Sequence, residues 1–185
     1  VGRHALAFAR AGFDTSAVDM AAAGLAELDK SAQAEGLTVS RQLAPMTELP
    51  FEDDSFDYVL SFNVIYHGDP EIVRRSISEI ARVLKPGGTM VIADVIVSED
   101  KDEAKLQNAI EIIRDPSHIR MLPESELLSS VNSAGFTIQS EDGWDKAREF
   151  EEWMGIVNDP QRVGPLRTVA RALAEEGRHA GMGLS

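Results

Sequence analysis

Apolar residues in the first half of the chain follow two spacings in turn. Some segments repeat apolar residues every three or four positions, which predicts helices, and others alternate or run continuously apolar, which predicts strands. The predicted helices are 3–11, 20–35 and 70–84, and the predicted strands are 13–18, 37–43, 56–62 and 89–97. Strands that alternate with helices in this way indicate βαβ units, and therefore an α/β fold with a parallel sheet.

The second half of the chain is predicted to be mainly helical. Residues 99–103 read as a charged loop, and 136–139 as a short additional strand. Helical spacing predicts the remaining elements at 104–113, 123–134, 150–157 and 160–176. We therefore expect a single domain over 1–185, with an α/β half at 1–97 and a helical half at 98–185.

The charge of the chain excludes two classes of partner. Its 185 residues include 31 acidic and 18 basic side chains, which gives a formal net charge of −13. Nucleic-acid backbones and anionic membrane surfaces both require a basic face, so we expect neither as the main partner. No apolar run approaches the ~20 residues that span a bilayer, and no signal peptide is visible. These features predict a soluble, cytoplasmic protein.

The absence of cysteine narrows the chemistry further. It excludes disulfides, zinc sites built on thiolates and a cysteine nucleophile. The spacing of Asp115 and His118 is compatible with a metal ligand pair, but the four histidines are scattered and no His-Glu-x-x-His motif is present. We therefore expect no metal site.

Candidate binding residues occur where the predicted strands end, and the ligand crevice of an open parallel sheet lies beyond those ends. Gly2 leads directly into a helix, where backbone N–H groups can approach a ligand, although an ordinary turn glycine fits as well. Asp19 closes a strand, and its carboxylate can accept hydrogen bonds from both hydroxyls of a ribose or cap the next helix. Met46 and Thr47 can line an adenine pocket, or Met46 can be a core methionine.

A second group of candidates follows the strand 56–62. Asn63 can hydrogen-bond an amino-acid-like part of a cofactor, and Tyr66 and His67 can face an acceptor molecule. A lone histidine is more often a structural residue than a catalytic one, so both interpretations of His67 stay open.

Three sequence blocks together resemble a known family. They are Leu49-Pro50-Phe51 with Ser55-Phe56-Asp57, the segment Asn63 to His67, and Glu79-Ile80-Ala81-Arg82-Val83-Leu84-Lys85-Pro86-Gly87-Gly88. In this order they resemble class I S-adenosylmethionine-dependent methyltransferases, particularly the small-molecule group that includes ubiquinone and menaquinone biosynthesis enzymes and tellurite-resistance-like proteins. The resemblance covers 1–97, which it makes the cofactor-binding half. It implies a Rossmann-like, doubly wound, mostly parallel sheet with helices on both faces.

The resemblance also implies S-adenosylmethionine as the cofactor. In this family's pattern Gly2 matches the last glycine of the cofactor loop, Asp19 the ribose-binding acid, and Met20 the residue that lies against adenine. The full set of expected cofactor-binding residues is Gly2, Asp19, Met20, Met46, Thr47, Phe62 and Asn63.

On the acceptor side, the resemblance implies a small-molecule substrate and allows a homodimer. His67 is the candidate base for a hydroxyl acceptor, whereas an acceptor that is already nucleophilic requires no base. Residues 114–120 resemble the acceptor-side segment of some members, so Tyr66, His118 and Arg120 are the expected substrate-binding residues.

The sequence departs from the family pattern in two places. The first strand and the earlier loop glycines are missing, and the chain also stops before the final strand, so we expect the given sequence to lack an N-terminal piece. Pro45 stands where the family often has an Asp that binds the adenine amino group. Because proline has no side-chain acceptor, we expect adenine to be recognised by backbone groups and packing.

Two other functions fit part of the pattern. Asp19 is equally compatible with a nicotinamide-dependent oxidoreductase, but neither tyrosine begins a Tyr-x-x-x-Lys pair, since Phe62 follows Tyr58 and Pro70 follows Tyr66 at that spacing. Pro45 and the incomplete glycine loop also fit a non-catalytic, methyltransferase-like binding or regulatory module.

Overall fold

The computed structural model describes residues 2–145, 147–155 and 159–177. The chain divides into two compact units, each made of segments that are separated in the sequence. Unit 1 comprises Val1–Val59 and Ser78–Thr89, and unit 2 comprises Leu60–Ile77 and Met90–Ser185. Each unit has a hydrophobic core of its own.

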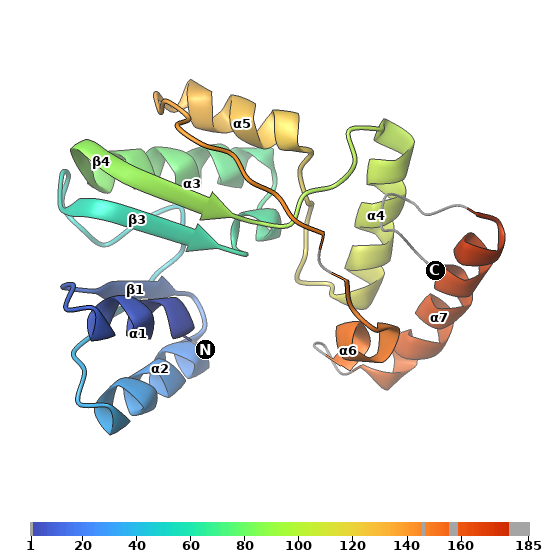
Figure 1. The fold of residues 1–185 in the computed structure, drawn as a ribbon, viewed down its shortest axis with the longest axis horizontal. Helices are drawn as coiled ribbons and strands as arrows, with labels where there is room; N and C mark the ends of the chain where they lie inside the picture. Colours follow the sequence, from blue (N-terminus) through green and yellow to red (C-terminus); the bar gives the residue numbers. More distant parts are fainter. Residues whose placement is uncertain (1, 146, 156–158, 178–185) are drawn as a thin grey trace. The chain divides into compact units, whose positions relative to one another are not determined.

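Strands and helices alternate in the first half of the chain, and helices follow in the second (Figure 1). In chain order the elements are α1 (Arg3–Arg10), β1 (Ser16–Asp19), α2 (Ala22–Ala34), β2 (Ser40–Leu43), β3 (Phe56–Phe62), the 3-10 helix η1 (Ile65–His67), α3 (Pro70–Val83), β4 (Leu84–Ala93), α4 (Lys101–Arg114), α5 (Glu124–Ser133), α6 (Phe150–Gly155) and α7 (Pro160–Glu175).

Unit 1 is built on the parallel pair of β1 and β2. Their register runs from Ser16 opposite Ser40 to Asp19 opposite Leu43. Helices α1 and α2 supply most of the core of this unit. Its buried members are Leu6, Leu28, Ala32 and Val39.

Strands β3 and β4 form a second pair and point in the same direction (Figure 1). Ser55 N donates to Val83 O at 2.8 Å before the strands, and Asn63 N donates to Ala93 O at 2.8 Å where they end. The residue numbers of the bonded partners therefore increase along both strands, as in a parallel pair.

Unit 2 contains two clusters of buried apolar residues. The first joins η1, α3 and α5, and its buried members are Ile65, Val73, Ile77, Leu122 and Val131. The second joins α4, α6 and α7 through Ile110, Met154, Leu166 and Leu173. The first residue of η1, Ile65, is only 2% exposed, so it anchors in the core the short helix that carries the candidates Tyr66 and His67.

Most predicted elements are confirmed. The strand predicted at 56–62 coincides with β3, and the predicted helices correspond to α1 to α7 with shifts of a few residues at their ends. The strand expected at 136–139 is wrong, because these residues have no strand partner even though Phe136 and Ile138 contact the first core cluster of unit 2. Residues 156–158 of the helix predicted at 150–157 lie outside the described residues.

The loop predicted at 99–103 is shorter in the structure, because α4 already begins at Lys101. The carboxylate of Asp100 accepts the backbone N–H groups of Asp102 at 2.9 Å and Glu103 at 3.0 Å. This N-cap, with acidic residues in the first turn, stabilises a helical start in a segment that lacks apolar periodicity.

The strand predicted at 89–97 also differs, because β4 starts and ends earlier, at Leu84–Ala93. The Lys-Pro-Gly-Gly sequence at 85–88 falls between the predicted helix 70–84 and the predicted strand 89–97, yet it lies within β4. A Cβ at Gly88 would lie 2.9 Å from Lys85 O and 3.2 Å from Asp57 O, so the close approach of the backbones requires glycine there.

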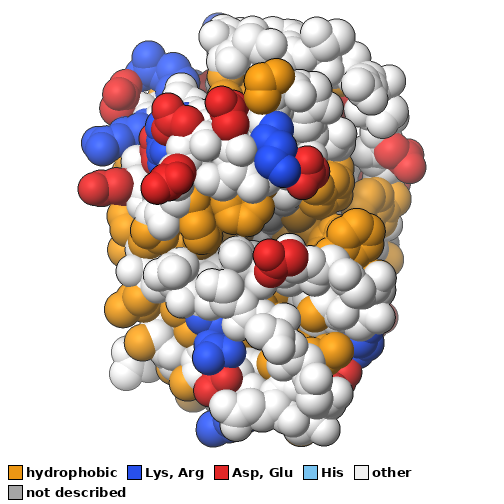
Figure 2. All heavy atoms as spheres, turned by 90° about the vertical axis from the view of Figure 1, so that its left-hand side faces the viewer, with side chains coloured by type: hydrophobic (Ala, Val, Ile, Leu, Met, Phe, Trp, Pro, Cys, Tyr) orange, Lys and Arg blue, Asp and Glu red, His pale blue; other side chains and the backbone are white. Residues whose placement is uncertain are grey.

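Acidic and basic side chains intermingle on the face of the molecule drawn in Figure 2, together with hydrophobic ones. Ion pairs between such side chains include Arg10 with Glu35 and Lys85 with Asp57. No helix in the part of the chain that the structure describes is both long enough and apolar enough to cross a membrane.

Replacing Ile77 by Ala should lower the free energy of unfolding by about 2–5 kcal/mol, because the deletion leaves a cavity in a closely packed core. Ile77 is 0% exposed in unit 2, whereas Ile113 is 45% exposed. The matched variant Ile113→Ala should change the same quantity by about 0.5 kcal/mol or less. Guanidinium unfolding followed by circular dichroism compares the two, and equal losses would contradict the assignment of Ile77 to the core.

Candidate functional site

Gly2 is required by the local structure of unit 1. It precedes α1 with φ 69° and ψ 12°, the left-handed conformation that glycine adopts most readily. A Cβ built at Gly2 would lie 2.5 Å from Leu28 Cδ1 in α2, so any other residue would also collide with the neighbouring helix. The first turn of α1 follows immediately. As at every helix start, its N–H groups have no carbonyl partner within the helix and can bind a ligand.

Asp19 is the last residue of β1, and its side chain is exposed. One carboxylate oxygen, Oδ1, accepts the N–H of Ala21 at 2.8 Å, so Asp19 supports the turn before α2, whose N-cap is Ala21. A carboxylate has about four acceptor positions, so this bond leaves capacity for both hydroxyls of a ribose. Met20 beside it is 73% exposed, which leaves its side chain open to a ligand.

The loop after β2 begins next to Asp19. Ala44 N donates to Asp19 O at 3.2 Å, and Glu48 N donates to Pro45 O at 3.2 Å, which closes a turn. Met46 and Thr47 form that turn and are half-buried. Unit 1 therefore brings together the exposed carboxylate and the two residues predicted to lie beside adenine.

Asn63 follows β3 with φ 53°, a left-handed conformation that few residues other than glycine and asparagine tolerate. Its N–H bonds Ala93 O, so the strand pairing ends at this residue. The chain turns sharply after Phe62 and enters η1. The unusual backbone of Asn63 thereby directs the segment that carries Tyr66 and His67.

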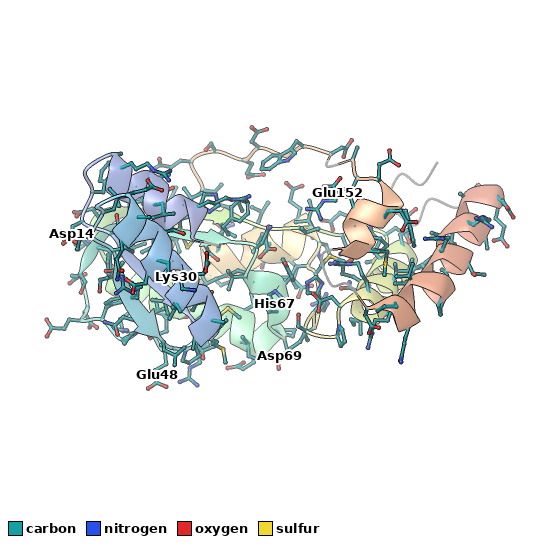
Figure 3. All side chains as sticks on the ribbon, turned by 90° about the horizontal axis from the view of Figure 1, so that it is seen from below. Asp14, Lys30, Glu48, His67, Asp69 and Glu152 are labelled. Carbon is teal, nitrogen blue, oxygen red and sulfur yellow. The ribbon has the colours of Figure 1, made fainter. Side chains whose placement is uncertain are left out.

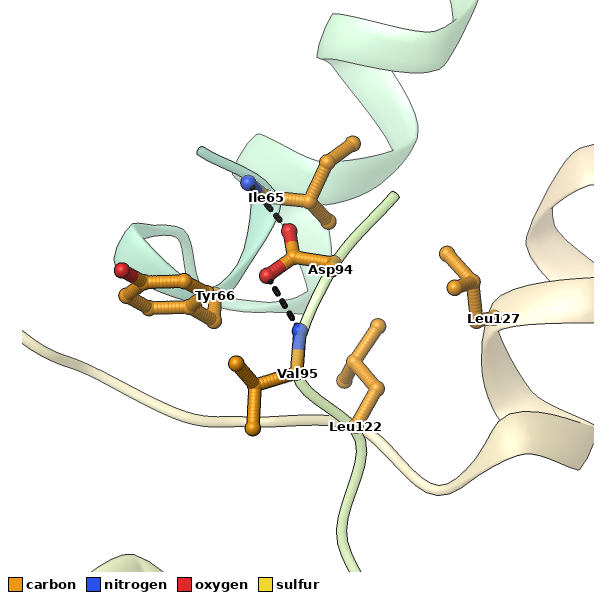
Figure 4. Close-up of a pocket in the computed structure, with 6 residues that line it drawn as sticks. All are labelled: Ile65, Tyr66, Asp94, Val95, Leu122 and Leu127. Carbon is orange, nitrogen blue, oxygen red and sulfur yellow. Dashed lines mark hydrogen bonds between the residues drawn. The ribbon is translucent and has the colours of Figure 1, made fainter. Parts of the chain in front are cut away.

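Asp94 holds that segment in place within unit 2. Its Oδ2 accepts Ile65 N at 2.8 Å and its Oδ1 accepts Val95 N at 2.8 Å (Figure 4). Burial raises the pKa of Asp94, while these backbone bonds and the nearby His67 act in the opposite direction. The adjoining hollow has a volume of only about 10 Å³, room for about one water molecule, and is lined by Ile65, Tyr66, Asp94, Val95, Leu122 and Leu127.

Three aromatic rings gather beside this hollow. The ring centroids of Tyr66 and His67 are 4.4 Å apart, those of Tyr66 and His118 are 4.3 Å apart, and those of His67 and His118 are 4.8 Å apart. The N–H groups of Ile119 and Arg120 both bond Tyr66 O, which joins the two segments through the backbone. Three of the predicted acceptor-side residues therefore form one cluster in unit 2.

The tautomer of His67 follows from its hydrogen bond. His67, labelled in Figure 3, has its Nδ1 3.0 Å from the backbone oxygen of Ser117. Because a carbonyl oxygen only accepts, Nδ1 must carry the proton, and the neutral ring keeps its lone pair on Nε2. That nitrogen is the one able to accept a proton from a substrate.

Charged groups at the end of α4 and just after it lie beside His118, which is 7% exposed. His118 Nδ1 lies 3.1 Å from Glu111 Oε1, although the angle is not that of a hydrogen bond, and Nε2 lies 3.5 Å from Asp115 Oδ2. Arg114 donates through Nε to the same Glu111 oxygen at 3.0 Å. The guanidinium of Arg114 also lies 5.2 Å from the centroid of the Trp153 ring.

These contacts determine the protonation of Glu111 and Tyr66. Burial by itself would raise the pKa of Glu111, but the contacts with His118 and Arg114 outweigh it and lower that pKa. Burial and the nearby carboxylates raise the pKa of Tyr66, so its phenol stays neutral and can donate a hydrogen bond.

Arg120, predicted to bind the substrate, already has a partner. Its Nη1 and Nη2 donate to the two carboxylate oxygens of Glu126 at 2.6 Å and 2.5 Å. A substrate would therefore compete with Glu126 for this guanidinium. In the described residues, no group of three or more His, Cys, Asp or Glu side chains is arranged to hold a metal ion.

The prediction from sequence missed Asp94 and Glu111. Asp94 interrupts an otherwise apolar strand, and an acid at that position signals a side chain that binds the loop beyond the strand. Glu111 and Arg114 are three residues apart on α4, which places them on one helical face, and His118 follows four residues after the helix ends. This spacing of ionisable residues could have predicted a charged cluster.

Comparisons with known proteins identify the family of this chain. Residues 1–92 match the sequence model of a family described as methyltransferase domain. The uncharacterized methyltransferase YcgJ of Bacillus subtilis is 29% identical over 154 residues, covering 83% of this chain and 60% of that protein. The demethylmenaquinone methyltransferase of Clavibacter sepedonicus is 37% identical over 94 residues, covering 50% of this chain and 37% of the relative. The chain therefore spans less than two thirds of the length of these relatives.

Solved structures show the same architecture. The crystal structure of YcgJ from Bacillus subtilis matches with a TM-score of 0.84 at 28% identity, over 91% of this chain and 72% of that one. A putative methyltransferase from Bacillus halodurans matches with a TM-score of 0.85 at 26% identity, over 92% and 74%. Together the fold and the match at 1–92 define a Rossmann-like methyltransferase domain whose family cofactor is S-adenosylmethionine. The chain belongs to the class I S-adenosylmethionine-dependent methyltransferases.

Glu111→Gln should destabilise the protein in a pH-dependent way. The pKa of Glu111 is lowered from its ordinary 4.5 by folding, so its ionised form stabilises the fold above that pH, and the contribution disappears as the pH falls through the folded pKa. The variant should be less stable than wild type at neutral pH, and the gap should narrow in acid.

Urea unfolding at neutral pH and in steps below 4.5 measures this gap. The exposed Glu152 on α6 supplies the matched control, because Glu152→Gln removes the same charge with no such contacts. A gap that stayed constant or widened in acid would contradict the role given to the contacts of Glu111.

Proposed function

We propose that the protein transfers a methyl group from S-adenosylmethionine to a small-molecule acceptor. S-adenosylmethionine supplies an activated methyl group on a sulfonium, so the protein needs no nucleophile of its own. This agrees with a chain that has no cysteine. The residues have to bind, orient and exclude water, and good orientation alone can remove ~7–11 kcal/mol of a barrier.

The observation that carries this proposal is the exposed carboxylate of Asp19 beside the loop of Met46 and Thr47. A carboxylate can accept both ribose hydroxyls, and the thioether of Met20 or Met46 can lie against an adenine ring. Pro45 offers no side-chain acceptor, so backbone groups of this loop would bind the adenine edge. Gly2 leaves the backbone at the start of α1 open to close approach.

His67 is proposed to act on the acceptor. Its Nε2 keeps the lone pair, so it can remove a proton from an acceptor hydroxyl. The rings of Tyr66 and His118 both pack against the His67 ring, and the bond to Ser117 O fixes its orientation. For an acceptor that is already anionic, His67 would shape the site without accepting a proton.

S-adenosylhomocysteine should stabilise the wild-type protein against heat, and Asp19→Ala should abolish the stabilisation. A ligand at 100 times its Kd stabilises the folded state by about 2.7 kcal/mol. The variant Asp14→Ala is the matched control, because Asp14 is also exposed but precedes β1. Thermal unfolding with and without ligand measures the effect, and an unchanged midpoint in the wild type would overturn the proposal.

His67→Gln should lower turnover by about 10²-fold or more if His67 is a general base. The Kd for S-adenosylhomocysteine should stay within about twofold of wild type, because His67 is assigned to the acceptor. Transfer of labelled methyl groups to a panel of hydroxylated compounds measures turnover, and calorimetry measures Kd. Undiminished turnover in His67→Gln would show that no base is required.

A second candidate function, a non-catalytic binding module, is favoured by Pro45. It predicts stabilisation by S-adenosylhomocysteine with no methyl transfer to any acceptor in the panel. The same thermal assay with nicotinamide cofactors tests the oxidoreductase alternative. A homodimer and a cytoplasmic location remain further proposals, the latter on the absence of cysteine.

A further inference from the structure

Glu79 and Arg82 hold both backbone polar groups of Leu49. They lie one turn apart on α3, within unit 1. Leu49 N donates to Glu79 Oε2 at 2.9 Å, and Arg82 Nη2 donates to Leu49 O at 2.9 Å. The position of Leu49 is therefore fixed on both sides of the residue.

All three nitrogens of the Arg82 guanidinium donate hydrogen bonds, either to Glu79 or to the segment 49–53. Nε and Nη2 donate to the two oxygens of Glu79, each at 2.9 Å, which aligns the pair. Nη1 donates to Phe51 O at 2.8 Å and to Asp53 Oδ1 at 2.8 Å. The planar fork of arginine can serve these diverging acceptors together, and a lysine cannot.

The loop that begins after β2 therefore has two anchors. At its start, Ala44 N bonds Asp19 O, and at its end, Leu49 is held by Glu79 and Arg82. Residues 45–48 lie between the anchors, and they include the turn of Met46 and Thr47. A short segment fixed at both ends samples few conformations, so little order has to be gained when a ligand binds.

We propose that Glu79 and Arg82 are positioning residues that preset the loop 45–48 for the adenine side of the cofactor. This inference rests on the proposed function. Neither side chain belongs to the apolar core of unit 1, and they remain 20% and 31% exposed respectively. A purely structural pair would change stability alone, whereas a positioning pair changes affinity for the ligand.

Arg82→Met should raise the Kd for S-adenosylhomocysteine by about tenfold, a change equivalent to about 1.4 kcal/mol. Titration calorimetry on the full chain measures it. The matched control is Arg10→Met, which removes the same charge and a two-bond pair with Glu35, with distances of 2.5 Å and 2.6 Å, at the far end of α1. Its Kd should equal that of wild type.

A spectroscopic readout separates positioning from a general loss of stability. In protein with ¹³C-labelled methionine methyl groups, the signal of Met46, assigned with Met46→Leu, should broaden or move toward the unfolded position in Arg82→Met. The signals of Met90 and Met121, which lie in unit 2, should stay unchanged. Arg82→Lys should give an intermediate Kd, because lysine can reach only part of the acceptor set.

The outcomes distinguish the two levels of the proposal. A wild-type protein that does not bind S-adenosylhomocysteine would overturn the proposed function, and this inference with it. A wild type that binds, with Arg82→Met and Glu79→Gln binding equally well and the Met46 signal unmoved, would overturn the inference alone. Weakening by Arg10→Met as large as that by Arg82→Met would also overturn it.

Discussion

The parallel pairing of β1 with β2 is the constraint on which the proposed cofactor site depends. Because Asp19 is paired with Leu43, the carboxylate and the loop after β2 leave the sheet at one edge. The bond from Ala44 N to Asp19 O extends that pairing into the loop. A register shift of one residue would turn Asp19 to the opposite face. A ladder of four residue pairs thus decides whether Asp19 and the loop 45–48 are neighbours.

Carboxylates that accept backbone N–H groups shape the loops in both units. Asp94 accepts the N–H of Ile65 in unit 2, and Glu79 accepts that of Leu49 in unit 1. A loop that leaves a strand has backbone donors without partners, and a fixed carboxylate satisfies them without another strand. The chemistry-bearing side chains next to these points, His67 among them, are therefore held before a ligand arrives, which is the basis of preorganised binding.

Local signals allowed much of the fold to be predicted from the sequence. Strand β3 and helix α3 were found because apolar spacing and the Asp69-Pro70 start agree with the tertiary packing. The early start of β4 was missed because a Pro-Gly-Gly sequence normally ends an element. The cofactor-binding candidates, Asp19 among them, were selected because they occur where predicted strands end. The contact of His67 with His118 was beyond prediction, because a sequence separation of this size carries no local signal and depends on how unit 2 folds.

A crystal structure of the chain with S-adenosylhomocysteine tests the central claim most directly. The account predicts both ribose hydroxyls at about 2.5–3.0 Å from the carboxylate of Asp19. It also predicts the adenine ring against Met20 and the loop 45–48. A ligand bound elsewhere on the chain, with the carboxylate of Asp19 facing only solvent, would contradict it.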